Sequence, residues 1–165
     1  MPNYKIDPSN SKVSFYASYL VIAKVKGDIL SFNGNISSEL EDLSDAQIEF
    51  TANVDSINTG IEERDNHIKS DHFLNADKFP LIKFISTSIE KKRTNYLIKG
   101  VLRIKETSKE VEITANYNQK SSSFDTSLTI SRNDYNLKFD STVKGNHLIG
   151  DEIKVFVNVE IPKNY

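Results

Sequence analysis

Runs in which apolar residues occupy every second position recur along most of the chain, and they constrain its fold more than any other feature. Val13, Phe15 and Ala17 alternate with polar neighbours, and Ile48 and Phe50 continue the same pattern further on. This two-residue period is typical of strands that bury one face. Further runs of this kind occupy 25–29, 32–36, 82–88, 96–104, 111–117, 124–130 and 153–161. Short polar turns separate them, as expected for antiparallel hairpins.

The number and spacing of these runs predict an all-β fold. The alternation slips by one residue at Leu30-Ser31, which indicates a bulge or bend between two strand segments. About eight strands then form an antiparallel sheet that either closes on itself or folds into a sandwich. Closure would remove exposed edge strands, and about eight strands make a barrel that is filled by side chains or holds one slender ligand. We predict a single domain over residues 1–165.

The alternation stops between Asp55 and Pro80, where we predict a helical insertion at about 60–79. Thr59 and Glu62 have the spacing of a capping box, so Thr59 is the expected N-cap. Asp71 is a second plausible N-cap, followed by a short helical turn. The prediction is therefore two short helices, which end before Pro80.

Several ionisable side chains of the insertion suggest a metal site. His67 and Asp71 are four residues apart and would share one face of a helix, but His72 would lie off that face. Without a convincing third ligand we predict no metal and no cofactor. Capping and ion pairing are the expected roles, with Arg64 and Asp65 tying the insertion to the barrel.

Arg132 and Asp134 could serve as an acid–base pair or as a phosphate contact, since guanidinium binds phosphate through two parallel hydrogen bonds. An ion pair that stabilises a turn is the better interpretation. The chain has no nucleophile paired with a base, no glycine-rich phosphate loop and no paired-carboxylate site. We therefore predict that it has no catalytic residues and is not an enzyme.

Composition narrows the remaining classes. Net charge is -2 and Lys and Arg are scattered, which excludes the basic surface of a nucleic-acid-binding protein. No apolar run approaches the roughly 18 residues of a membrane span. Cysteine is absent, so disulfides and thiolate metal sites are excluded. We expect a cytoplasmic protein, with the periplasm as the alternative if a signal segment has been removed.

The insertion and the strands around it resemble the YceI-like family, also called polyisoprenoid-binding lipocalin-like proteins. The resemblance rests on Asp55-Ser56-Ile57-x-Thr59-Gly60, Arg64-Asp65-x-His67-Ile68, Ser70-x-x-Phe73-Leu74 and Phe79-Pro80-x-Ile82-x-Phe84. It extends to Val25-x-Gly27-x-Ile29, Tyr96-x-Ile98-x-Gly100, Ser131-Arg132-Asn133-Asp134-Tyr135 and Gly150-Asp151-Glu152-Ile153. It therefore covers nearly the whole chain. Three departures are Tyr19, Glu106 and Asn136, which stand where members commonly have His, Gly and Gly.

The resemblance implies a lipocalin-like antiparallel barrel of eight strands with a short helical insertion. It also implies a bacterial lipid-binding protein, a role in transport and a link to stress responses. The ligand would be a long-chain apolar amphiphile, namely a polyisoprenoid, a prenyl quinone or a fatty chain, carried without catalysis. The expected partner is this lipid. We expect no nucleic-acid partner and no membrane-spanning segment, and a homodimer is possible.

The expected ligand-binding residues lie on the inward phase of the strands and in the insertion. They are Phe15, Ala17, Tyr19, Val25, Ile29, Phe32, Ile48, Phe50, Ala52, Ile61, Ile68, Phe73, Leu74, Phe84, Leu102 and Arg132. Small residues such as Ala17, Ala52 and Gly100 would leave the tube open. Composition alone favours a packed core, whereas the family resemblance favours an open tube. Two alternatives stay open. One is an enzyme that acts on a lipid-like substrate through His67 and His72, and the other is a closed-core interaction module without a ligand.

Overall fold

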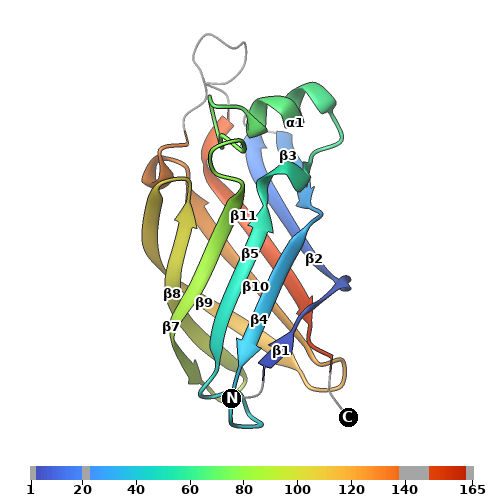
Figure 1. Ribbon diagram of the computed structural model, residues 1–165, viewed down its shortest axis with the longest axis vertical. Coiled ribbons are helices and arrows are strands. Elements are labelled where there is room, and N and C mark those ends of the chain that lie inside the picture. The colour runs from blue at the N-terminus through green and yellow to red at the C-terminus, as the bar shows by residue number, and fades with distance from the viewer. Residues whose placement is uncertain (1–2, 20–22, 138–148, 163–165) are drawn as a thin grey trace.

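The computed structural model describes residues 3–19, 23–137 and 149–162. These residues form eleven strands, one α-helix and two short 3₁₀ turns (Figure 1). The elements are β1 (Asn3–Lys5), β2 (Asp7–Tyr19), β3 (Ala23–Ile29), β4 (Phe32–Ser37), β5 (Gln47–Asn53), a 3₁₀ turn (Val54–Ser56), β6 (Ile57–Asn58), α1 (Glu62–Lys69), β7 (Leu81–Lys91), β8 (Asn95–Ile104), β9 (Thr107–Asn118), β10 (Ser123–Ser131), a second 3₁₀ turn (Asn133–Tyr135) and β11 (Ile149–Glu160).

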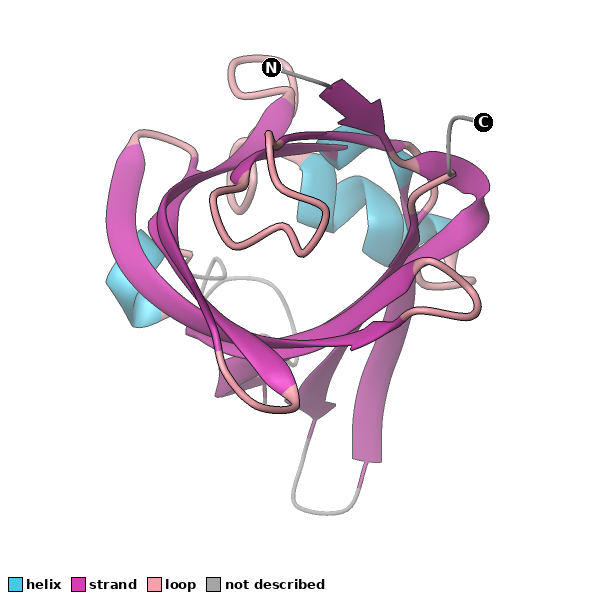
Figure 2. Ribbon diagram, turned by 90° about the horizontal axis from the view of Figure 1, so that it is seen from below, coloured by secondary structure: helices cyan, strands magenta, loops and turns pink. Residues whose placement is uncertain are grey.

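All the described strands belong to one antiparallel sheet. Its order is β1-β4-β5-β7-β8-β9-β10-β11-β2-β3-β6. Most neighbours in this order are also consecutive in the chain, as in the hairpins from β7 to β10. The sheet curls strongly, and the view along its axis in Figure 2 shows the strands arranged as a ring. The all-β, barrel-like fold predicted from the alternation is confirmed.

The two ends of the sheet meet because two long strands are bent. The first bend lies at Leu30 and Ser31, between β3 and β4, where the phase of the alternation slips. The second is the 3₁₀ turn between β5 and β6. Hydrogen bonds join the bends: the Leu30 N–H donates to the Ser56 carbonyl at 3.1 Å, and the Asn53 N–H donates to the Ser31 carbonyl at 2.9 Å. The bent strand β3–β4 thus lies between β2 and β5–β6 and joins the sheet into a ring.

The predicted number of strands was too low. The sequence indicated eight, whereas the described residues form eleven. The bends divide two long strands, so that β3 and β4 count separately, as do β5 and β6. The third additional strand is β1, which has three residues and pairs with β4 on the side away from β5.

The core lies inside the ring. Along β8 the side chains of Tyr96, Ile98 and Ile104 are buried, while those of Lys99 and Arg103 are exposed to solvent. Residues of a strand point alternately to its two faces, so the buried set faces the interior. The same alternation along the other strands makes the barrel interior apolar.

The helical insertion, residues 59–80, lies over one end of the barrel (Figure 1). It contains one α-helix rather than the predicted two. The helix begins at Glu62 with Ile61 as N-cap, not Thr59, because the Thr59 hydroxyl bonds to the side chains of Asp65 and Arg64 instead of capping the first turn. The chain after Ser70 forms turns, so Asp71 does not begin a second helix.

A loop of residues 38–46 covers the opposite end of the barrel, which faces the viewer in Figure 2. The Asp45 carboxylate organises this loop by accepting hydrogen bonds from the Ser38 hydroxyl and the Glu39 N–H. The hydroxyl of buried Tyr96 donates to the Asp42 carbonyl at 2.5 Å and ties the loop to β8. Burial raises the pKa of Tyr96, so its hydroxyl stays protonated and continues to donate.

Candidate functional site

Two apolar cavities lie inside the barrel. The α1-end cavity has a volume of about 110 Å³ and is lined by strand residues together with Ile68, Phe73 and Leu74 of the insertion. The far cavity has a volume of about 190 Å³ and extends toward the end covered by the 38–46 loop. Both are lined mainly by aliphatic and aromatic side chains. Such concave apolar spaces are the usual sites for small apolar ligands.

The two cavities adjoin. Five branched side chains line both of them, and we call this set the waist: Ile29, Ile82, Ile104, Ile130 and Val155. They come from β3, β7, β8, β10 and β11, which are distributed around the ring. The two cavities therefore follow one another along the barrel interior, with the waist between them.

The insertion forms part of the wall of the α1-end cavity because its backbone folds back after the helix. The Leu74 N–H donates to the Ile68 carbonyl at 3.0 Å, and the Asn75 N–H donates to the Ser70 carbonyl at 2.7 Å. Asn75 has a φ of 51°, a left-handed conformation that Asn adopts more readily than most residues. The reversal places Phe73 and Leu74 beside Ile68 in the cavity wall, with all three side chains buried.

Asp65 and Arg64 hold the start of the helix on Thr59, which directly follows β6. The Asp65 carboxylate is buried and accepts hydrogen bonds from the Thr59 N–H at 2.9 Å and from the Thr59 hydroxyl. Arg64 donates from Nε to the Thr59 hydroxyl at 2.8 Å and from a terminal nitrogen to the Thr59 carbonyl at 2.9 Å. We predicted that Arg64 and Asp65 tie the insertion to the barrel; their hydrogen bonds go instead to Thr59, the first residue of the insertion.

Arg132 lines the α1-end cavity from the end of β10. Its guanidinium donates to the Leu137 carbonyl at 3.0 Å, and burial lowers its pKa while nearby Asp151 opposes that shift. Hydrogen bonds from the Ser131 hydroxyl and the Asn133 N–H lower the pKa of Asp151, so this carboxyl is ionised at neutral pH. The sequence suggested Asp134 as the partner of Arg132, whereas the carboxylate that raises its pKa is Asp151, on the neighbouring strand β11.

Most of the predicted ligand-binding residues line the two cavities. Those at the α1-end cavity are Phe15, Ala17, Val25, Ile29, Ile68, Phe73, Leu74 and Arg132. Those at the far cavity are Ile29, Ile48, Phe50, Ala52, Phe84 and Leu102. Their role in binding stays a prediction.

Two predicted residues do not join these walls, and the side chain of a third is outside the described structure. Phe32 is buried but stacks on Phe50, with ring centroids 5.8 Å apart, and is not among the lining residues. Ile61 is the N-cap of α1 and 52% exposed, because the helix begins one residue later and turns this side chain outward. The Tyr19 side chain lies outside the described part of the structure. Gly100 does not leave space either, since a Cβ atom there would lie 2.5 Å from the Phe84 ring.

Sequence reasoning missed most of the waist. Ile82, Ile104, Ile130 and Val155 all occupy inward positions of predicted strands, so the alternation marks them as buried. It does not distinguish a residue that lines a cavity from one that packs in the core. That distinction depends on the distances across the ring.

The histidines of the insertion do not form the predicted helical pair. The helix ends at Lys69, and Ser70 is its C-cap, so His67 and Asp71 do not share a helix face. His72 lies 3.7 Å from the Asp71 carboxylate, and the rings of His67 and His72 stack with centroids 6.3 Å apart. Among the described residues, no group of three or more His, Cys, Asp or Glu side chains could hold a metal ion.

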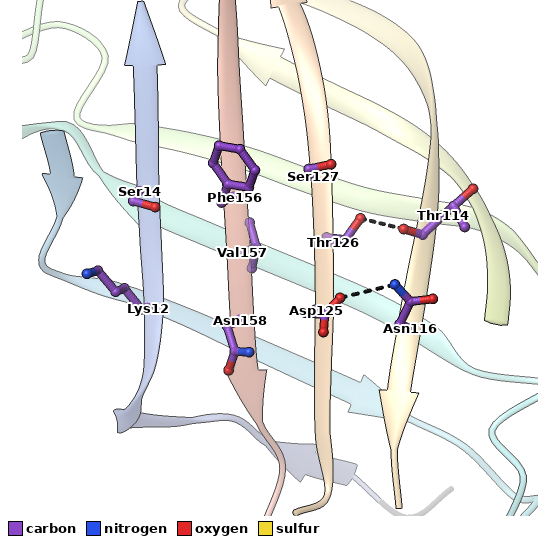
Figure 3. Close-up of a pocket in the computed structure, with 10 residues that line it drawn as sticks. All are labelled: Lys12, Ser14, Thr114, Asn116, Asp125, Thr126, Ser127, Phe156, Val157 and Asn158. Atoms are coloured by element: carbon purple, nitrogen blue, oxygen red, sulfur yellow. Dashed lines mark hydrogen bonds between the residues drawn. The ribbon is translucent and has the colours of Figure 1, made fainter. Parts of the chain in front are cut away.

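A shallow groove with a volume of about 380 Å³ lies on the outer face of the barrel (Figure 3). It crosses β2, β11, β10 and β9, and most of the side chains around it are polar. Two hydrogen bonds span its β9–β10 side, from Asn116 to Asp125 at 3.2 Å and from the Thr126 hydroxyl to the Thr114 carbonyl at 2.8 Å. This polar, solvent-exposed groove does not fit an apolar chain.

Comparison with known proteins identifies the family. The model of the YceI-like domain matches residues 4–161. The chain belongs to the YceI-like family. A UPF0312 protein of Staphylococcus aureus strain MSSA476 is 29% identical to this YceI-like chain over 170 residues, which cover 97% of each protein. The resemblance noted in the sequence is thereby confirmed.

Solved structures of other proteins share the fold of this YceI-like chain. The crystal structure of BcnA from Burkholderia cenocepacia has a TM-score of 0.85 and 20% identity, covering 96% of this chain and 99% of that one. A polyisoprenoid binding domain from Saccharophagus degradans has a TM-score of 0.68 and 13% identity, covering 96% and 98%. Within the described residues, no helix is both long and apolar enough to cross a bilayer.

Proposed function

We propose that this protein is a non-catalytic carrier that holds the apolar chain of an amphiphile inside its barrel. The chain would be that of an isoprenoid, a prenyl quinone or a fatty acid. The observation that carries the proposal is the pair of adjoining apolar cavities along the barrel interior. Membership of the YceI-like family and the fold shared with a polyisoprenoid binding domain support it.

The composition of the cavity walls favours binding by burial of apolar surface. Each Å² of apolar surface removed from water contributes roughly 25 cal/mol, without any specific polar contact. Arg132 and Arg64 are the charged residues in the wall of the α1-end cavity. We place the polar head group of the ligand at this end, where water and cationic side chains can both solvate it.

The proposal excludes catalysis as the main activity. Among the described residues, the side chains around the two cavities include no histidine and no acid–base pair of the kind that hydrolysis requires. His67 and His72, which the enzyme alternative needs, are not among the lining residues. The insertion would instead cover the bound chain, since it supplies Ile68, Phe73 and Leu74 to the wall.

Native mass spectrometry of the freshly purified protein, followed by extraction and identification of any passenger, tests the proposal. Ala17→Trp would fill the α1-end cavity, and Thr129→Trp on the exposed outer face of β10 is the matched control. We expect the wild type and the control to bind an apolar passenger, and the Ala17 variant to lose it while keeping its fold. Equal binding by all three proteins would refute the cavity assignment.

A further inference from the structure

The interior of the barrel is short and interrupted. The α1-end cavity measures about 110 Å³ and the far cavity about 190 Å³, and the waist separates them. For comparison, a dry cavity of about 150 Å³ lined by Leu, Ile and Phe holds one benzene molecule. Each cavity therefore has room for roughly six carbon atoms, and a chain that extends through both would bury on the order of ten.

The waist resists widening. Its five residues are isoleucine or valine, whose branched Cβ restricts χ1. They also come from strands on several sides of the ring, so one rotamer change does not open it. Ile29 and Ile104 are buried, which further limits their movement, because protein interiors are close-packed and transmit strain.

Aromatic rings limit the far cavity. The Phe84 ring lies against Gly100 so closely that a Cβ atom at Gly100 would come within 2.5 Å of it. The ring therefore occupies the volume that a side chain on β8 would otherwise fill, and it projects into the cavity wall. Further along, Phe124 packs against Tyr117 and Tyr96, with centroids 4.5 and 5.6 Å away.

Beyond these rings the 38–46 loop lies over the end of the barrel (Figure 2). Tyr96 is 5% exposed, and its hydrogen bond to Asp42 holds the loop in place. A chain that enters at the α1 end and passes the waist would therefore meet this loop. A longer tail would have to displace the loop to extend further.

We propose that the barrel buries about ten carbons of its ligand, and that the waist and Phe84 set this limit. This inference rests on the proposed function and narrows its ligand class. Amphiphiles with chains of medium length are the matching ligands, and the additional carbons of a long polyprenyl chain contribute nothing to affinity. Phe84 and Ile130 are then specificity-determining residues, because they limit the depth to which a chain can enter.

A series of straight-chain fatty acids with eight to twenty carbons provides the test, with dissociation constants measured by calorimetry. Each added methylene that is buried contributes about 0.8 kcal/mol, or roughly a fourfold gain in affinity. We expect this gain up to about ten to twelve carbons and a plateau beyond. The matched control is Thr129→Ala on the outer face of β10, which should leave the profile unchanged.

Two mild variants should move the plateau in opposite directions. Phe84→Leu removes part of the ring and should extend the plateau to longer chains, and Ala52→Leu fills the far cavity and should shorten it. Thermal unfolding of each variant shows whether it folds, and Ile130→Val at the waist replaces Phe84→Leu if that variant does not. Affinity that keeps rising to twenty carbons, or a plateau that no variant moves, would overturn the length limit. A protein that binds no fatty acid of any length would overturn the proposed function and the limit with it.

Discussion

Replacing Asp65 by alanine should loosen the insertion without unfolding the barrel. The buried carboxylate accepts hydrogen bonds from the N–H and the hydroxyl of Thr59. A hydrogen bond to a charged group contributes about 1.5–3 kcal/mol. Water can replace part of the hydrogen bonding that Thr59 loses. We therefore expect the loss of both bonds to lower the stability of the insertion by about 3 kcal/mol. Arg64 would still donate to Thr59, so the contact would weaken rather than disappear.

The expected effect is local. A loss of about 3 kcal/mol raises the opening constant of the affected segment by roughly a hundredfold. Hydrogen–deuterium exchange should therefore accelerate at the amides of Thr59, Leu74 and Asn75, whose hydrogen bonds organise the insertion. Exchange in β8 and β9, which pair along their full length, should change little.

Glu63→Ala is the matched control, since Glu63 lies on the same helix and is exposed. It should leave exchange in the insertion nearly unchanged. Unaltered protection of the Thr59, Leu74 and Asn75 amides in the Asp65 variant would refute the role assigned to the carboxylate. Acceleration over the whole barrel would also refute it, because the contact would then support global rather than local stability.

Three further substitutions test the barrel itself. Gly100→Ala should destabilise the protein by about 1–3 kcal/mol in urea unfolding, because the new Cβ would lie 2.5 Å from a backbone carbonyl of the adjacent strand. The control, Gly34→Ala, should cost less, because a Cβ atom there would meet only side chains, at 3.1 Å or more. Tyr96→Phe should lower Tm by about 2–4 °C through the loss of about 1 kcal/mol of hydrogen bonding. Asp45→Asn should reduce stability at pH 7 but not in acid. Hydrogen bonds within the 38–46 loop hold the pKa of Asp45 below its ordinary 3.8, so its stabilisation is present above that value and is lost as the pH falls toward the native pKa. Unfolding curves from pH 2.5 to 7 should show the two proteins converging at the acid end.

The strands could be predicted from sequence because each buries one face. The alternation around Val13 and along β5 leaves one face mainly apolar, and that fixes which side chains point inward. The bend at Leu30 and Ser31 was visible for the same reason, since it reverses the phase. The inward phase also identified Ala17 and Ala52, which line the cavities.

What the sequence did not predict depends on which partner a side chain meets in the folded chain. The capping box at Thr59 matched a local rule, but its hydroxyl bonds to Asp65 and Arg64 instead. The approach of Asp151 to Arg132 requires β10 and β11 to be paired, and no sequence spacing indicates it. The waist and the volumes of the cavities depend on distances across a ring, which alternation does not contain.

Thr59 lies between α1 and β6, the short strand that pairs with β3. Strand β6 has only two residues, yet it pairs with β3 where the ends of the sheet meet. Thr59 follows it directly and receives the hydrogen bonds of Asp65 and Arg64. These hydrogen bonds therefore hold the start of α1 next to β6. They also fix the chain directly after the two-residue pairing of β6 with β3. Movement of the insertion to admit a ligand would strain this short strand first, whereas the long hairpins from β7 to β10 could remain intact. The carrier role proposed above requires one end to open, and we expect the opening to begin at the two-residue pairing of β6 with β3.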